Sequence, residues 1–135
     1  MSYEDKLANF INKLYTKLGE DPAIVEACKG AEQDAVIELT ISDVPDVVWQ
    51  IGAKKGKWFV NKGSVDTATA AISYLKLKYL NDWWSGKLAA EALFSQGGMQ
   101  ILEGSFDDLS FLAPVEEPLK KAYQELKGEF PGLPE

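Results

Sequence analysis

Histidine and arginine are absent from this 135-residue sequence, and cysteine occurs once, at Cys28. Without histidine, no Ser-His or Cys-His nucleophile and no histidine-ligated metal can be assembled. One cysteine cannot form an intramolecular disulfide, which suits a reducing compartment, and on a short helix it is typical of a small core residue. We therefore predict no catalytic residue and no metal site.

Long apolar runs are missing as well. None approaches the ~20 residues of a membrane span, and no apolar secretory signal opens the sequence. All 14 basic residues are lysines, and the net charge is −7. Because phosphate backbones are bound by clustered Lys and Arg, an acidic, arginine-free domain is a poor nucleic-acid binder, and anionic membranes repel it overall. These absences predict a cytoplasmic protein without a nucleic-acid partner and with at most transient membrane contact.

The overall composition is that of an ordinary globular domain, with 46% hydrophobic and 26% charged residues. A chain of this size buries about 68% of its unfolded surface, which is enough for one core. We expect a single domain over residues 1–135. Within it, residues 128–135 form a tail or a cover, because this stretch holds two prolines and two glycines.

Two helices are predicted in the first thirty residues. Apolar side chains recur at helical spacing from Leu7 to Leu18, and Gly19 follows. Asp21 and Pro22 are typical of the start of a second helix, which Gly30 ends.

From Ala35 the apolar period changes to two, which is typical of half-buried strands. We predict three antiparallel strands at residues 35–41, 47–51 and 57–62, with residues 52–56 as a hairpin loop. An Ala- and Thr-rich fourth strand is expected at residues 67–75.

The rest of the sequence alternates between short helices and one strand. A helix is expected at residues 76–85, a second short helix ends at Gly97, and a fifth strand covers residues 99–103. A last helical region begins at Asp107, is broken near Pro114, and continues as an amphipathic helix with exposed Glu–Lys pairs at four-residue spacing. The expected fold is α+β, a five-stranded, largely antiparallel sheet covered on one face by helices.

Four lysines stand on or beside the predicted hairpin of this acidic sequence: Lys54, Lys55, Lys57 and Lys62. They either form an ordinary solvated loop or provide a dock for an anionic head group.

Apolar residues and glycines stand in a distinctive order between Tyr79 and Gly104. The order is carried by Gly86-Lys87-Leu88, Ala92-Leu93-Phe94, Gln96-Gly97, Met99, Ile101 and Gly104. In these residues the sequence resembles the sterol carrier protein type 2 family of nonspecific lipid-transfer domains. It departs from the family in Ala89-Ala90, where Asn-Pro is common, in a Gly97–Gly104 spacing one residue longer, and in the bulky Trp83-Trp84 pair.

The resemblance implies an apolar tunnel between the sheet and the helices. It also implies a fatty acid, fatty acyl-coenzyme A, sterol or phospholipid guest, without a cofactor and without covalent chemistry. The residues expected to contact the guest are Leu80, Trp83, Trp84, Leu93, Phe94, Gln96, Met99, Ile101, Phe106, Leu109, Phe111, Leu112, Leu119 and Tyr123. Among them Gln96, or alternatively Gln100, would meet a polar head.

Two other functions compete with the lipid carrier. The same apolar stretch can fill a core, in which case the domain is an interaction or accessory module with a protein partner or a second copy of itself. A histidine-free enzyme acting through a carboxylate such as Asp82 or Glu103 is the third reading, and no spacing in the sequence supports it.

Overall fold

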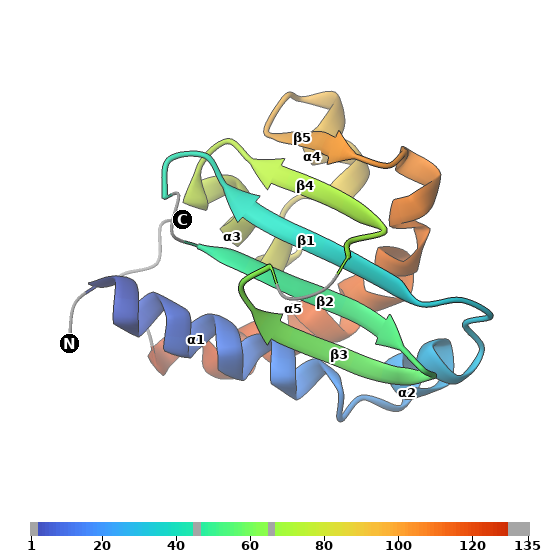
Figure 1. The fold of residues 1–135 in the computed structure, drawn as a ribbon. Coiled ribbons are helices and arrows are strands. Elements are labelled where there is room, and N and C mark those ends of the chain that lie inside the picture. The colour runs from blue at the N-terminus through green and yellow to red at the C-terminus, as the bar shows by residue number, and fades with distance from the viewer. Residues whose placement is uncertain (1–2, 45–46, 65–66, 130–135) are drawn as a thin grey trace.

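The computed structural model describes residues 3–44, 47–64 and 67–129. Figure 1 shows one sheet with helices packed behind it. The elements in chain order are α1 (Tyr3–Leu18), α2 (Pro22–Lys29), β1 (Ala35–Ile41), β2 (Val48–Lys54), β3 (Lys57–Lys62), β4 (Ala70–Tyr74), α3 (Leu77–Ser85), α4 (Ala90–Ser95), β5 (Met99–Glu103), η1 (Phe106–Val115), α5 (Glu116–Leu126) and η2 (Lys127–Glu129).

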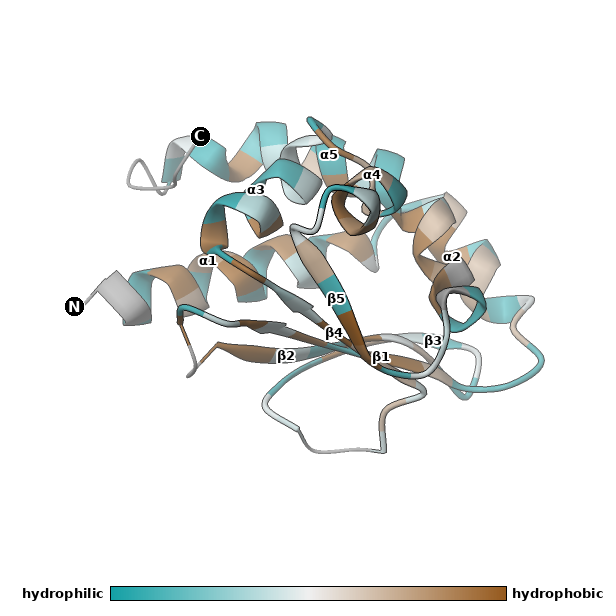
Figure 2. Cartoon of the chain, turned by 90° about the horizontal axis from the view of Figure 1, so that it is seen from above, coloured by the Kyte–Doolittle hydropathy of each residue, from teal (hydrophilic) through white to brown (hydrophobic). Residues whose placement is uncertain are grey.

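The five strands form a single sheet in the order β3-β2-β1-β4-β5. The β1–β4 pair is parallel and the other three pairs are antiparallel. Seen from above in Figure 2, the helices all lie over one face of the sheet. The predicted α+β fold, with a largely antiparallel sheet covered on one face, is therefore confirmed.

The β2–β3 hairpin is longer than the sequence predicts, and the predicted five-residue loop is wrong. Residues 52–54 continue β2, and only Lys55 and Gly56 form the turn, with φ of 54° and 76°. Positive φ at both central residues is the geometry that matches the twist of the flanking strands. Gly52 suits a strand here because a Cβ atom at this position would collide with the carbonyl oxygen of Ala35.

The fourth strand is shorter than predicted, since it begins at Ala70 and ends at Tyr74. Its pairing with β5 contains a bulge: Ala71 pairs with Glu103 and Ile72 pairs with Ile101, so Leu102 has no partner on β4. Leu102 is the extra residue of this bulge, and its side chain is 58% exposed.

The helical region after β5 consists of the 3₁₀ helix η1, which includes Pro114, and of α5. The change of helix type between Val115 and Glu116 lies next to the predicted break near Pro114. A capping box starts the 3₁₀ helix, because the Asp108 carboxylate accepts hydrogen bonds from the backbone N–H (2.7 Å) and the hydroxyl of Ser105. Pro118 lies in the first turn of α5, where its missing N–H interrupts no helical hydrogen bond.

Helix α1 and helix α5 lie side by side over the sheet, and α3 packs on α5. Their apolar side chains and those of the central strands form one core, to which α4 contributes only Ala90 and Leu93. The bulkiest fully buried side chains of this core are the two consecutive indoles of α3, Trp83 and Trp84.

Candidate interior binding site

Most of the predicted guest-contacting residues lie together in the layer between the sheet and the helices. The members that are at most 5% exposed are Leu80, Trp83, Trp84, Leu93, Met99, Leu109, Leu112, Leu119 and Tyr123. They come from α3, α4, β5, η1 and α5. The sequence therefore identified the residues of one apolar layer, and this layer is the candidate site.

The remaining predicted residues lie outside that layer or at its margin. Phe94 is 43% exposed and Gln96, like Gln100, is exposed to solvent, so these side chains lie on the surface. Ile101 and Phe111 are partly buried against the core. The side chain of Phe106 falls outside the described part of the chain.

The two neighbouring indoles have different environments. Trp84 packs against Phe10 of α1 at 5.7 Å between ring centroids, and its Nε1–H donates a hydrogen bond to the hydroxyl of Tyr15 over 3.1 Å. Both the ring and the N–H of Trp84 are thus fully used in holding α3 to α1, which makes this residue structural.

Trp83 faces strand β4 instead. Its ring stacks on Tyr74 with 6.2 Å between centroids and 28° between planes. Within the described residues, neither the Trp83 indole nitrogen nor the Tyr74 hydroxyl has a hydrogen-bond partner, although both atoms are buried. Buried polar groups of folded proteins are rarely left in this condition, so the pair needs an explanation.

Glu116, the first residue of α5, completes a polar cluster with these two side chains. Burial raises the pKa of the Glu116 carboxyl, while the backbone N–H of Ala90 and the nearby indole N–H of Trp83 oppose the rise. The indole N–H lies near this carboxyl without completing a hydrogen bond of normal geometry. Burial raises the pKa of Tyr74 well above its ordinary value, and the charges of Tyr15 and Glu116 add to that rise. We call Tyr74, Trp83 and Glu116 the interior polar cluster.

Sequence reasoning missed two members of the interior polar cluster. The sequence predicts exposed Glu–Lys pairs at four-residue spacing on the terminal helix, and Glu116 with Lys120 is one of these pairs. Glu116 stands three residues before Leu119 and seven before Tyr123. This helical spacing places Glu116 on the apolar stripe, and it is the sequence pattern that could have identified the residue. Tyr74 ends an apolar strand, and no pattern marks its hydroxyl as unpaired.

Replacing Glu116 by glutamine is expected to change how stability depends on pH. Because its pKa is raised in the folded state, the folded protein binds more protons than the unfolded chain between the two pKa values. The contribution of Glu116 to the free energy of unfolding is therefore full below the unfolded pKa and is lost as pH rises through the folded pKa. Urea unfolding should show the stability of Glu116→Gln rising relative to the parent between mildly acid and neutral buffer. Glu117→Gln, at an exposed neighbouring position, is the control, and a stability difference that ignores pH would contradict the expectation.

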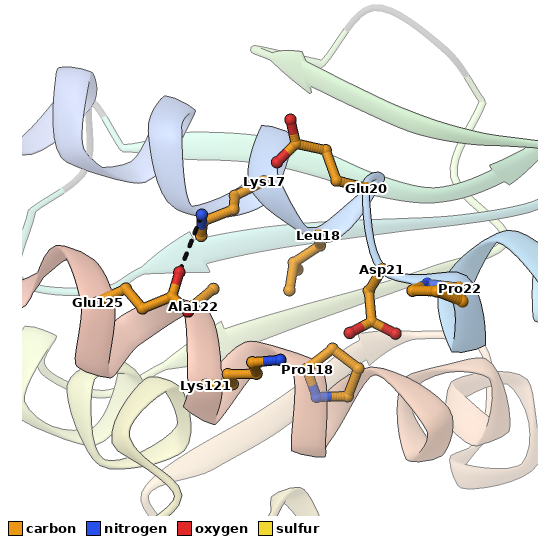
Figure 3. A pocket seen from close by; sticks show the side chains of 9 residues that line it. All are labelled: Lys17, Leu18, Glu20, Asp21, Pro22, Pro118, Lys121, Ala122 and Glu125. Carbon is orange, nitrogen blue, oxygen red and sulfur yellow. Dashed lines mark ion pairs between the residues drawn. The ribbon is translucent and has the colours of Figure 1, made fainter.

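Open grooves elsewhere on the molecule have charged rims. One of about 190 Å³ lies where α1 ends beside α5, and Lys17 and Glu125 form an ion pair of 2.9 Å in it. Figure 3 shows this pair among the lining residues, which also include Asp21 and Lys121. A second, of about 420 Å³, lies between α2 and β3 and is lined in part by Cys28 and Lys57. Neither groove contains a residue of the apolar layer.

The hairpin lysines do not form one cluster. Lys54 and Lys57 are paired across the β2–β3 turn, whereas Lys62 lies at the far end of β3, opposite Trp49. The Lys54 ammonium lies 5.4 Å from the centroid of the Phe59 ring, which fixes it against the sheet. The dock for an anionic head group would therefore consist of the turn lysines without Lys62.

The two carboxylates considered for catalysis lie on different elements. Asp82 is buried on α3, and Glu103 is exposed at the end of β5. Over the described ranges, no three His, Cys, Asp or Glu side chains are placed to hold a metal ion, and none of the helices in that part is both long and apolar enough to cross a bilayer.

Comparisons with known proteins give a clear result for the fold alone. No family model and no curated protein matches the sequence. Among solved structures, the sterol carrier protein domain 2 of Helicoverpa armigera is 19% identical with a TM-score of 0.64, covering 86% of this chain and 89% of that one. The apo form of sterol carrier protein 2 from Yarrowia lipolytica is 23% identical with a TM-score of 0.58, covering 83% and 88%.

A stereoselective inverting sec-alkylsulfatase from Pseudomonas sp. is also similar, at 17% identity and a TM-score of 0.51. The match covers 64% of this chain but only 13% of the sulfatase. This chain therefore corresponds to a small part of that enzyme.

Proposed function

We propose, from the premise that this chain has the sterol carrier protein 2 fold, that it binds and carries an apolar small molecule of the lipid type. The observation that carries the proposal is the continuous apolar layer between the sheet and α3, α4 and α5, in the same fold that carrier domains use. The guest classes in question are a fatty acid, its coenzyme A ester, a sterol-like molecule or a phospholipid. The proposed site is the apolar layer defined above, and in this reading the domain shields its guest from water and performs no covalent step.

Entry of the guest is proposed to occur by displacement of α4. This helix has six residues and buries only Ala90 and Leu93. Glycines flank it: Gly86 ends α3 with φ of 78°, and Gly97, also with φ of 78°, precedes β5. An element with so few buried contacts opens at low free-energy cost, whereas α3 is held to α1 through Trp84.

Burial of an alkyl chain supplies the driving force. Each buried CH₂ contributes about 0.8 kcal/mol before ordering costs, so a chain of about ten carbons gains several kcal/mol net of them. The affinity then depends on the length and bulk of the guest's apolar chain more than on its functional groups. We therefore expect the protein to bind many different apolar chains.

Replacing Leu93 by phenylalanine is expected to weaken guest binding about tenfold. The larger side chain takes part of the space beneath α4 that the guest needs, and forcing the guest against it costs about 1–3 kcal/mol. The measurement is displacement of a fluorescent fatty acid by unlabelled lipid, with purified and delipidated protein.

Phe94→Arg is the control, because the Phe94 side chain is 43% exposed and is not among the buried members of the apolar layer. Equal affinity in the parent and in Leu93→Phe would argue against a guest beneath α4. Organic extraction of the purified protein, followed by lipid mass spectrometry, identifies any guest retained from the cell.

A second candidate function is an accessory module whose core is filled by its own side chains. The observation that favours it is the fully used Trp84, packed on Phe10 and hydrogen-bonded to Tyr15 in the middle of the predicted site. Native mass spectrometry separates the two: a bound lipid supports the carrier, and a bare chain in complex with a protein partner or a second copy supports the module.

A further inference from the structure

The interior polar cluster is a feature that apolar shielding alone does not require. Tyr74 and Trp83 are at most 1% exposed, and their hydroxyl and indole N–H lack a hydrogen-bond partner among the described residues. Leaving such groups unpaired in a core costs stability, whereas phenylalanine at either position would carry no such cost. The arrangement is therefore explained if the two donors meet a polar atom that arrives with a guest.

We propose that Tyr74, Trp83 and Glu116 form a binding subsite for the oxygen atom of an uncharged, hydroxyl-bearing apolar guest. This inference rests on the proposed carrier function and adds the chemistry of the polar end that the site selects. It also moves the contact with the polar end from the exposed Gln96 and Gln100 to the interior.

The donors and acceptors of the cluster match a hydroxyl group. The Trp83 indole N–H can only donate, the Tyr74 hydroxyl donates or accepts, and the Glu116 carboxylate accepts. A guest hydroxyl oxygen accepts from Trp83 and Tyr74, and its own proton is donated to Glu116. All three protein groups are then satisfied by one atom and its hydrogen, which an ether or ketone oxygen cannot achieve because it has no proton to give.

The same cluster discriminates against an ionised fatty acid. Glu116 is partly buried, and the indole N–H of Trp83 and the backbone N–H of Ala90 lie beside its carboxyl. A guest carboxylate placed there would meet the negative charge of Glu116 and would lose part of its own solvation beside the buried rings of Tyr74 and Trp83. The neutral alcohol avoids both costs.

The test compares dodecanol with dodecanoate in neutral buffer and follows the indole N–H signals by NMR. The Trp83 signal is assigned by its loss in Trp83→Phe. Dodecanol is expected to shift the Trp83 signal and to bind more tightly than dodecanoate, while the Trp84 signal, already hydrogen-bonded to Tyr15, stays in place. Binding without any response of the Trp83 signal, or tighter binding of dodecanoate, overturns the subsite but leaves the carrier function standing.

The Tyr74→Phe variant gives a more specific test, because we expect it to weaken guest binding without lowering the stability of the guest-free protein. Removing one hydrogen bond to the guest should weaken dodecanol binding about fivefold and so reduce the preference for dodecanol over dodecanoate. Removing an unpaired hydroxyl from the core should keep or raise the urea midpoint of the guest-free protein. Tyr79→Phe, on the partly exposed side of α3, is the control and should change neither property.

Two results would show that the cluster does something else. A lower urea midpoint for guest-free Tyr74→Phe, together with a slowly exchanging water close to the Trp83 N–H, would assign the cluster to a structural water and overturn the subsite. Failure of the parent protein to bind either probe overturns the carrier function itself, and that outcome differs from a loss of preference between the two probes.

Discussion

Replacing Trp84 by alanine is expected to lower the free energy of unfolding by about 3–5 kcal/mol. The indole is fully buried between α1 and α3, so its removal leaves a large cavity against Phe10. The substitution also deprives the Tyr15 hydroxyl of the N–H that donates to it over 3.1 Å. Small domains have a total stability of about 5–15 kcal/mol, so a substantial part of the margin would be lost. Urea unfolding followed by circular dichroism measures the change.

Phe94→Ala is the control for the Trp84 substitution. Its ring is 43% exposed, so its truncation should lower the free energy of unfolding by only about 1 kcal/mol. If Trp84→Ala proved equally mild, the packing of α3 on α1 described above would be wrong.

Replacing Gly52 by alanine is expected to destabilise the protein by about 3 kcal/mol or more. Gly52 has φ of +152° and pairs with Val36 in the β1–β2 ladder. A Cβ atom there would strike the carbonyl oxygen of Ala35, which is backbone and cannot turn away. Backbone strain and overpacking each cost about 1–3 kcal/mol, and here both apply.

Gly63→Ala separates the two contributions. Gly63 also has positive φ, of +92°, but an added Cβ would have nothing within 4 Å. This variant should lose only the conformational cost of about 1–2 kcal/mol. Equal losses at the two positions, measured by urea unfolding, would show that the collision with Ala35 contributes nothing.

The fold was predictable where local chemistry decides the structure. Asp21 and Pro22 start α2 as expected, with the Asp21 carboxylate accepting from the N–H of Ala23 over 2.9 Å. Gly52 misled the prediction because glycine is typical of both turns and close backbone contacts. Only the register against β1 distinguishes the two roles, and register is a long-range property.

The candidate site was predictable as a set of apolar residues but not as an arrangement. Helical spacing identified Leu119 and Tyr123 as inward-facing, and burial confirms that orientation. The same reasoning treated Trp83 and Trp84 as equivalent. They differ because their side chains leave α3 in different directions, one toward β4 and the other toward α1, and only tertiary packing fixes what each indole nitrogen meets.

The bulge at Leu102 has a consequence for how copies of this protein behave in concentrated solution. A regular outer strand offers free backbone groups onto which another chain can extend the sheet, and from there fibres grow. The bulge makes the row of backbone groups on the edge strand β5 irregular, which hinders pairing with another chain. At the opposite edge of the sheet, β3 begins and ends with a lysine. Both borders are therefore poor starting points for intermolecular strand pairing, and aggregation should require unfolding first.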